Sequence, residues 1–278
     1  MPIRGARACY LAAALLMFGP AVTLAASGRV QLDDMTWTEV SEALRAGTTT
    51  VIIPVGGTEQ NGPHMVLGKH NFRAGALSGR IAAKLGNAVV APVMAYVPEG
   101  QVSPPGGHMR FAGTISVPED AFASVLAGAA RSMKQHGFVD IVLIGDSGNY
   151  QGRLKQVADR LNREWAGTPA RAHHISAYYD AASAGFNQIL RARGFNDHQI
   201  GSHAGLADTS LMMGVDATRV RPEQFRAATA PEPSSGVQGD PLQASTALGQ
   251  LGADLIVDRT VAAIRQATAG RKAARHKE

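Results

Sequence analysis

Short apolar runs alternate along this chain with longer segments in which apolar residues recur every three or four positions. The runs are rich in β-branched side chains and predict buried strands, at residues 49–55, 88–96, 140–144 and 171–179. The periodic segments predict amphipathic helices, at residues 32–46, 71–85, 121–136, 150–165 and 242–267. We expect the last helix to be lightly broken at Gly249 and Gly252, because glycine weakens a helix interior.

This alternation predicts the fold class. Strands and helices that alternate at these lengths favour right-handed crossovers and a mostly parallel sheet with helices on both faces. The chain has 278 residues with 45% hydrophobic side chains, enough to bury a full core, and no internal repeat divides it. We therefore predict a single three-layer α/β/α domain over residues 27–270, followed by a basic tail at residues 271–278.

The N-terminus has the pattern of a secretory signal peptide. Arg4 and Arg7 precede an apolar run at residues 10–18, and the small residues Ala25 and Ala26 follow it. A retained membrane anchor is the alternative, but the run is too short to cross a bilayer. We predict cleavage after Ala25 or Ala26, which removes residues 1–26 and leaves a periplasmic or secreted protein without a stable membrane anchor.

Cysteine content and charge narrow the function classes. The only cysteine, Cys9, lies in the predicted signal, so the mature protein has neither a disulfide nor a catalytic thiol. Loss of Arg4 and Arg7 leaves 25 basic residues against 22 acidic ones, a formal charge of +3. Apart from the tail, the basic residues are scattered and aromatic residues are sparse. We therefore expect no nucleic-acid partner.

The loop after the first predicted strand concentrates candidate ligands. Residues 59–70 read Glu-Gln-Asn-Gly-Pro-His-Met-Val-Leu-Gly-Lys-His and include Glu59, Asn61, His64 and His70. In open α/β sheets, ligands bind beyond the carboxyl ends of the strands, where this loop lies. Carboxylate and imidazole groups are common metal ligands, so the loop predicts a metal site.

Five segments, in this order along the chain, resemble the motifs of one known family. Residues 59–64 resemble Glu-x-His-Gly-Pro-His, and residues 111–116 resemble Phe-Pro-Gly-Thr-Ile-Ser. Residues 144–149, Ile-Gly-Asp-Ser-Gly-Asn, resemble Asn-Gly-His-Gly-Gly-Asn. Residues 203–210 and 236–241 resemble His-Ala-Gly-x-x-Glu-Thr-Ser and Gly-Val-x-Gly-Asp-Pro. These are motifs of the creatininase (creatinine amidohydrolase) family, and the resemblance implies a creatininase-like α/β/α fold.

The resemblance also implies a metal-ligand set. The family's first metal ion is held by a Glu, an Asp and a His, which correspond here to Glu59, His70 and Asp146. Asp and His have exchanged places, so the ligand types are preserved. Two carboxylates and one imidazole suit zinc or manganese, with iron as an alternative.

The family's second metal ion loses its ligands in this chain. Its His, its bridging Asp and its remaining carboxylate correspond to Asn61, His70 and Gly148. We therefore expect one divalent ion per chain, and a second only if His64 or His108 contributes a nitrogen.

Each candidate also has a purely structural interpretation. Glu59 could cap a helix or turn. Asn61 and His64 are turn formers if their side chains bind local backbone, and otherwise contact substrate or support the metal ligands. His108 lies in a Pro/Gly-rich loop at residues 98–108, where it either covers the site or has only a structural hydrogen bond.

His203 is the candidate for proton transfer. Histidine titrates near neutral pH, so it can give a proton to a leaving nitrogen and take it back. The family's His at this place is assigned that role. Asp208 takes the place of the family's Glu and is expected to orient His203 or a water, with the N-cap of a helix at residues 209–215 as the alternative.

Together these residues predict a metal-dependent amidohydrolase. The metal-activated water would attack a small, cyclic amide, and His203 would protonate the departing amine. A lactone, ester or peptide hydrolase and a catalytically silent exported binding protein are the alternatives. No Gly-x-Ser-x-Gly segment surrounds a serine, so a serine hydrolase is not indicated. The expected partners are a small-molecule substrate and, from the resemblance, further copies of the chain in a homo-oligomer.

Overall fold

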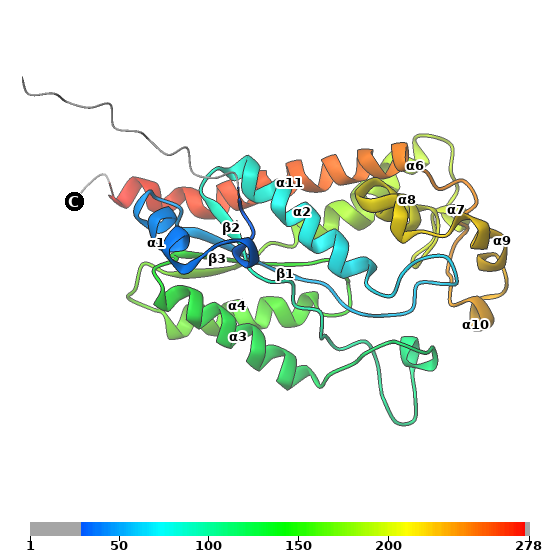
Figure 1. Ribbon diagram of the computed structural model, residues 1–278, viewed down its shortest axis with the longest axis horizontal. Coiled ribbons are helices and arrows are strands. Elements are labelled where there is room, and N and C mark those ends of the chain that lie inside the picture. The colour runs from blue at the N-terminus through cyan, green and yellow to red at the C-terminus, as the bar shows by residue number, and fades with distance from the viewer. Residues whose placement is uncertain (1–28, 276–278) are drawn as a thin grey trace, which may run out of the picture.

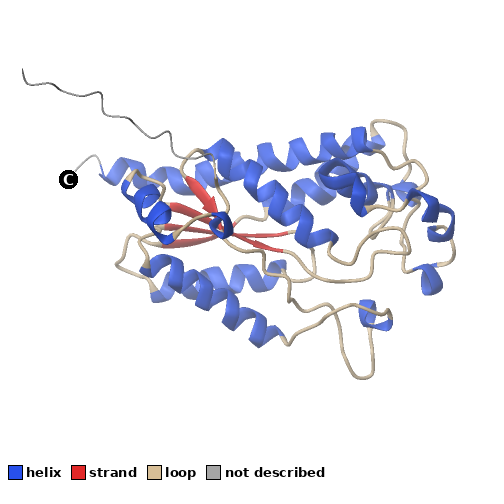
Figure 2. Cartoon of the chain, in the orientation of Figure 1, coloured by secondary structure: helices blue, strands red, loops and turns tan. Residues whose placement is uncertain are grey.

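The computed structural model describes residues 29–275, so the predicted signal peptide at residues 1–26 lies outside the described residues, as do residues 276–278. Its four strands are β1 Thr50–Val55, β2 Ala88–Val90, β3 Asp140–Gly145 and β4 Arg171–His174. They pair in parallel in the order β2-β1-β3-β4. Helices lie on both faces of this sheet (Figures 1 and 2), which confirms the predicted α/β/α architecture.

The two central strands are buried on both sides and separate two apolar cores. In β1, Val51 and Ile53 contribute to the first core, while Ile52 lies in the second. In β3, Leu143 contributes to the first core and Val142 to the second. Successive residues of a strand point to opposite faces, so a strand covered on both faces needs apolar residues at every position. This is why the strands read as uninterrupted apolar runs in the sequence.

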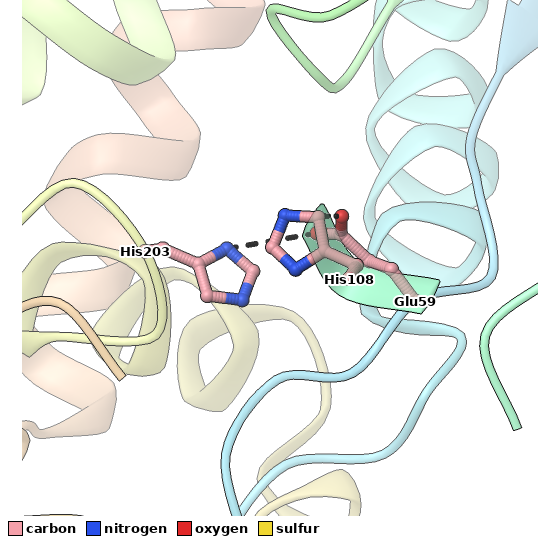
Figure 3. Close-up of side chains that lie close together, drawn as sticks. All are labelled: Glu59, His108 and His203. Atoms are coloured by element: carbon pink, nitrogen blue, oxygen red, sulfur yellow. Dashed lines mark ion pairs between the residues drawn. The ribbon is translucent and has the colours of Figure 1, made fainter. Parts of the chain in front are cut away.

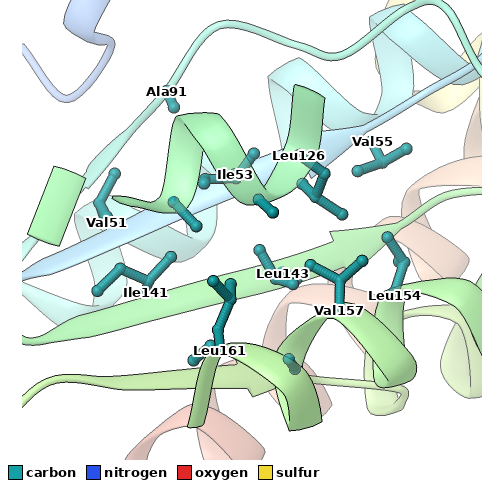
Figure 4. Close-up of a cluster of buried hydrophobic side chains, with 14 of the residues drawn as sticks. Val51, Ile53, Val55, Ala91, Leu126, Ile141, Leu143, Leu154, Val157 and Leu161 are labelled. Carbon is teal, nitrogen blue, oxygen red and sulfur yellow. The ribbon is translucent and has the colours of Figure 1, made fainter. Parts of the chain in front are cut away.

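Different helices cover the two cores. The first core receives side chains from α1 Trp37–Arg45, α3 Glu119–Gln135 and α4 Gln151–Glu164, and Figure 4 shows Leu126 of α3 and Leu154 of α4 packed against the strands. The second core lies under α2 Lys69–Leu85, α5 Ala177–Asp180, α6 Phe186–Arg191, α8 Leu206–Asp216 and α11 Thr246–Arg275. No helix within residues 29–275 has the length and apolar character needed to cross a membrane.

Short helical turns complete the described chain. They are η1 Leu32–Asp34, η2 Gly107–Arg110, the π-helical η3 Ala181–Gly185, α7 Asp197–Ile200, η4 Ala217–Arg219, η5 Pro222–Gln224, α9 Phe225–Ala228 and α10 Glu232–Ser235. Most of them lie between β4 and α11, a stretch in which the sequence pattern predicts few elements.

Several predicted boundaries are wrong for identifiable reasons. The helix predicted at residues 32–46 begins only at Trp37, because Thr36 forms a capping box with Glu39. The strand predicted at residues 88–96 ends at Val90. Beyond it only an isolated bridge joins Met94 to β1, and the intervening Pro92 has no N–H to donate. The strand predicted at residues 171–179 ends at His174, and the chain turns into α5.

The closing helix is not broken at Gly249 or Gly252. Helix α11 runs without interruption from Thr246 to Arg275, and both glycines lie inside it. A Cβ atom on Gly249 would lie 1.7 Å from the carbonyl oxygen of Ser210, and one on Gly214 would lie 2.4 Å from the carbonyl carbon of Gly249. The glycines therefore allow the backbones of α8 and α11 to approach closely rather than ending the helix.

Candidate functional site

The three residues expected to bind the first metal ion lie together at the carboxyl ends of β1 and β3. Glu59 lies in the loop that follows β1, Asp146 comes directly after β3, and His70 is the second residue of α2. His70 Nε2 lies 2.8 Å from Glu59 Oε1, and His70 Nδ1 lies 2.6 Å from Asp146 Oδ2. The imidazole therefore bridges the two carboxylates by direct hydrogen bonds.

Two further basic side chains of α2, Lys69 and Arg73, also bind carboxylates here. Arg73 donates Nε and Nη2 to Asp146 Oδ2 (2.8 and 2.6 Å) and Nη1 to Asp208 Oδ1 (2.8 Å). Lys69 Nζ donates to Asp208 Oδ2 (2.9 Å) and lies 3.6 Å from Glu59 Oε1. The side chains of Lys69 and Arg73 are only 1% and 3% exposed. We call these six side chains the α2 ion cluster: Lys69, His70, Arg73, Glu59, Asp146 and Asp208.

The α2 ion cluster is balanced in charge. Burial alone would raise the pKa of its carboxyls, but contact with the basic side chains outweighs burial and holds the pKa values of Glu59, Asp146 and Asp208 below their usual range. Burial and Lys69 lower the pKa of His70, yet the hydrogen-bonded carboxylates raise it overall. Three negative charges therefore face three positive ones near neutral pH.

A second group shares Glu59 with this cluster. Figure 3 shows its three side chains, Glu59, His108 and His203. His108 Nε2 is 3.2 Å from Glu59 Oε2, and His203 Nδ1 is 3.7 Å from Glu59 Oε1. One ligand atom from each of the three residues lies within 4.8 Å of the other two. Within residues 29–275 this is the one such group of three or more His, Cys, Asp or Glu side chains. We call it the outer Glu-His-His group.

Gln60 orients both imidazoles of this group. Its Nε2 donates to the carbonyl of Gly236 (2.9 Å) and lies 3.0 Å from His108 Nδ1 and 3.1 Å from His203 Nε2, while His203 Nε2 lies 2.9 Å from the Gln60 carbonyl oxygen. With Nε2 of His203 held against Gln60, Nδ1 on the other side of the ring faces Glu59 Oε1 at 3.7 Å. A cation between them would satisfy both.

The backbone at Ala204 directs His203 into the site. Among the described residues, Ala204 is the one other than glycine that has a positive φ (56°). Its N–H donates a hydrogen bond to Asp208 Oδ2 (2.9 Å). Asp208 lies in the first turn of α8 after the N-cap Gly205, so it is not the N-cap itself. Burial, followed by Lys69, lowers the pKa of His203 to about 3. The imidazole is therefore neutral at pH 7, as a metal ligand must be.

Glu99 is a buried carboxyl next to this group. It follows the fully buried Val97, and its side chain lies within 3.4 Å of the amide nitrogen of Asn149. Burial, followed by the charge of Glu59, raises the pKa of Glu99 to about 8. Glu99 therefore carries a proton at neutral pH and adds no charge beside Glu59.

Asn61 and His64 lie outside the pocket and support the loop. Asn61 Nδ2 donates to the carbonyls of Glu59 (2.9 Å) and Val66 (3.0 Å). His64 Nε2 lies 2.9 Å from Thr209 Oγ1, and burial followed by Lys69 lowers the His64 pKa to about 4. These contacts support the interpretation of both residues as loop structure.

A pocket of about 410 Å³ opens beside both groups. Its lining includes Glu59, His108 and His203 of the outer group, and Tyr179 and Asn149 on other sides. A second hollow of about 360 Å³ adjoins it. The two share five lining residues, Asn187, Ile200, Gly201, Ser202 and Gln238.

Lys69, Arg73, Gln60 and Glu99 belong to the site but are not among the residues that the sequence motifs indicate. For the two cations a signal existed, because Lys69 and Arg73 are four residues apart and would lie on one face of a helix. The apolar periodicity predicts a helix that begins only at residue 71, whereas α2 begins at Lys69 and includes both residues. No local signal marks Gln60 or Glu99, whose partners come from distant segments.

The two groups differ in their fitness for a metal ion. His70 uses both ring nitrogens in hydrogen bonds to carboxylates, so it offers no free lone pair. The outer group offers one carboxylate and two neutral imidazoles, a donor set that suits zinc or manganese. The ligand role expected for Glu59, His70 and Asp146 therefore stays a prediction, and the outer group is the better fit.

Comparisons with known sequences agree with the motif resemblance. A family model described as creatininase, creatinine amidohydrolase, matches residues 33–264. A creatinine amidohydrolase from Pseudomonas putida is 28% identical over 259 residues, which cover 86% of this chain and 98% of the relative. A mycofactocin precursor peptide peptidase from Mycobacterium tuberculosis (strain CDC 1551 / Oshkosh) is 27% identical over 235 residues, covering 76% of this chain and 82% of the relative.

Solved structures give the same result. A crystal structure of creatinine amidohydrolase matches with a TM-score of 0.70 at 27% identity, covering 86% of this chain and 98% of that one. A zinc form and a manganese form of creatininase each match with a TM-score of 0.69, at 25% and 26% identity and the same coverage. The structural neighbours thus carry zinc or manganese, and this chain has a Glu-His-His group that could bind such an ion.

Proposed function

Because this chain belongs to the creatinine amidohydrolase family, a family of metal-dependent amidohydrolases, we propose that it hydrolyses the C–N bond of a small, cyclic amide. One divalent ion would be held by Glu59, His108 and His203. The observation that carries this proposal is the convergence of these three side chains at the wall of the 410 Å³ pocket.

A divalent ion held there would supply an activated water and polarise the substrate carbonyl. Gln60 fixes the ring orientation of His108 and His203, so the ligand atoms are aligned before an ion arrives. The leaving nitrogen also needs a proton. His203 is neutral at pH 7 and so lacks the second ring proton that an acid would give up, whereas Tyr179 keeps its hydroxyl proton because burial, followed by Asp208, raises its pKa. Tyr179 lines the pocket and is therefore a proton donor available to the leaving group.

A peptide hydrolase is the second candidate, and the adjoining hollow favours it. The two cavities share five lining residues, so an extended chain could lie across both. One relative is described as a peptide peptidase. A cyclic amide of a few heavy atoms would fill only the first pocket, so turnover of short peptides in preference to cyclic amides would favour this second function.

The ligand assignment is tested by metal content. His108→Ala and His203→Ala should each bind less zinc than the wild-type protein by elemental analysis, and both should lose amide turnover. His136→Ala is the matched control, because His136 is an exposed residue at the C-terminal end of α3. If His203→Ala keeps its ion but loses turnover on the order of a hundredfold or more, His203 is the acid expected from the sequence and not a ligand.

The substrate class is tested with cyclic amides, lactones and short linear peptides. Turnover of the cyclic amides by the zinc-loaded or manganese-loaded protein, lost in His108→Ala, is the expected result. A fully metal-loaded protein that turns over none of these compounds would instead indicate a catalytically silent binding protein.

A further inference from the structure

The first turns of α2 place three basic side chains among three carboxylates, two of which are buried. We propose that the cations Lys69 and Arg73, together with the hydrogen bonds of His70, close the α2 ion cluster to metal, so that the chain binds a single ion, and only at the outer Glu-His-His group. This inference rests on the proposed function for the position of that one ion. The exclusion of metal from the cluster rests on the contacts within the cluster itself.

The hydrogen bonds of the cluster leave little room for a ligand bond. Asp146 Oδ2 receives His70 Nδ1 (2.6 Å), Arg73 Nη2 (2.6 Å) and Arg73 Nε (2.8 Å). Asp146 Oδ1 accepts from the hydroxyl of Tyr178 (2.8 Å). Both ring nitrogens of His70 point at carboxylate oxygens, at 2.6 and 2.8 Å, and Nδ1 also lies 3.3 Å from Arg73 Nη2, so neither nitrogen faces open space. An ion could enter only by displacing these donors.

Electrostatics works against an ion as well. Two cations, Lys69 and Arg73, already lie against the carboxylates, and five of the six side chains are at most 6% exposed, with Asp208 at 20%. A dication placed among them would lie beside Lys69 and Arg73, where repulsion is little screened by water. Removing one side chain of the cluster would leave a buried charge without its partner, which lowers the free energy of unfolding. The cluster is therefore stable as an ion-pair network and unfavourable as a metal site.

The outer group has the opposite properties. Its two imidazoles face the carboxylate of Glu59, with His108 Nε2 at 3.2 Å and His203 Nδ1 at 3.7 Å. The His108 side chain is 25% exposed, so solvent and ions can reach it. Glu59 belongs to both groups, and the cluster fixes its carboxylate through His70 while Oε2 faces His108. The cations of α2 thus position Glu59 for the single ion that we propose.

The test measures the equivalents of metal bound. Metal-stripped proteins are loaded with Zn²⁺ or Mn²⁺, passed through gel filtration and analysed for metal. We expect one equivalent in the wild type, one in Asp146→Asn and none in His108→Ala. Combining His108→Ala with His70→Asp, Arg73→Ala and Asp146→His removes two cations and restores the family's ligand order, so this protein should bind one equivalent again.

Two equivalents in the wild type, or loss of the ion from folded Asp146→Asn, would overturn the inference. A wild type that binds no ion while the combined variant binds one would support the exclusion and contradict the proposed function. Should Asp146→Asn fail to fold, imidazole ¹⁵N spectra of the wild type decide the matter. Zinc saturation should shift His203 and leave both ring nitrogens of His70 protonated, whereas a zinc-bound nitrogen on His70 would overturn the inference.

Discussion

At the scale of the residue, His70 shows how neighbours determine chemistry. Its position in the motif predicts a metal ligand, but the structure gives both of its ring nitrogens to carboxylates. Neutral imidazole is a ligand, whereas imidazolium between two carboxylates is a cation. The same residue in the same loop therefore has different chemistry depending on the side chains that α2 brings near it.

Arg73 should contribute strongly to stability. Arg73→Met leaves Asp146 and Asp208 without their guanidinium partner, and breaking a buried ion pair in this way costs roughly 3–5 kcal/mol. Urea unfolding monitored by circular dichroism measures the change. Arg80→Met is the control, since the pair of Arg80 with Asp254 is 48% and 65% exposed and should change the free energy of unfolding by less than about 1 kcal/mol. Similar losses in both variants would contradict a structural role for the cluster.

Glu99 should make stability depend on pH. Burial and the charge of Glu59 raise its pKa from 4.5 to about 8 in the folded state. Between these values the folded protein holds a proton that the unfolded chain has released, so the stability contributed by Glu99 falls as pH rises from 4.5 to about 8. Glu99→Gln cannot titrate. The free energy of unfolding of this variant, relative to wild type, should therefore rise between pH 5 and pH 8, and a constant difference would contradict the raised pKa.

At the scale of the element, the start of α2 matters more than its length. A helix from residue 71 excludes Lys69 and His70, whereas the observed helix begins at Lys69 and places His70 and Arg73 on the face turned toward β3. Three residues of one helix can then reach carboxylates from three other segments. A boundary shift of two residues thus changes the interpretation of the whole site.

The contact between α8 and α11 should tolerate no side chain at Gly249. Gly249→Ala places a Cβ within 1.7 Å of the Ser210 carbonyl oxygen, so the two helices must separate. We expect a loss of roughly 1–3 kcal/mol in the free energy of unfolding. Gly128→Ala in α3 is the matched control, because nothing lies within 4 Å of its new Cβ, and it should gain roughly 0.5–1 kcal/mol. A gain in both variants would show that the helices do not need this close approach.

At the scale of the whole molecule, we predict that the protein is exported. We expect protein recovered from the producing cells to begin at Ala26 or Ser27 and to lie outside the cytoplasm, because residues 1–26 have the order of a signal peptide. N-terminal sequencing of the fractionated protein checks both points. Intact Met1 on protein from the cytoplasmic fraction would contradict export. The homo-oligomer expected from the resemblance also stays a prediction, for which sedimentation is the measurement.

The amino-acid sequence alone is enough to predict the α/β/α layers, the parallel sheet and the family. These features depend on local signals, since β-branched runs bury strands, apolar periodicity buries one helix face, and motifs keep their order along the chain. The partners of His70 and of His203 were decided only by the tertiary structure. The contacts of His70 and Arg73 with Asp146 depend on how α2 packs against β3. Whether His203 meets His108 depends on two loops separated by about ninety residues. Such distances result from packing between elements, which no spacing along the chain encodes.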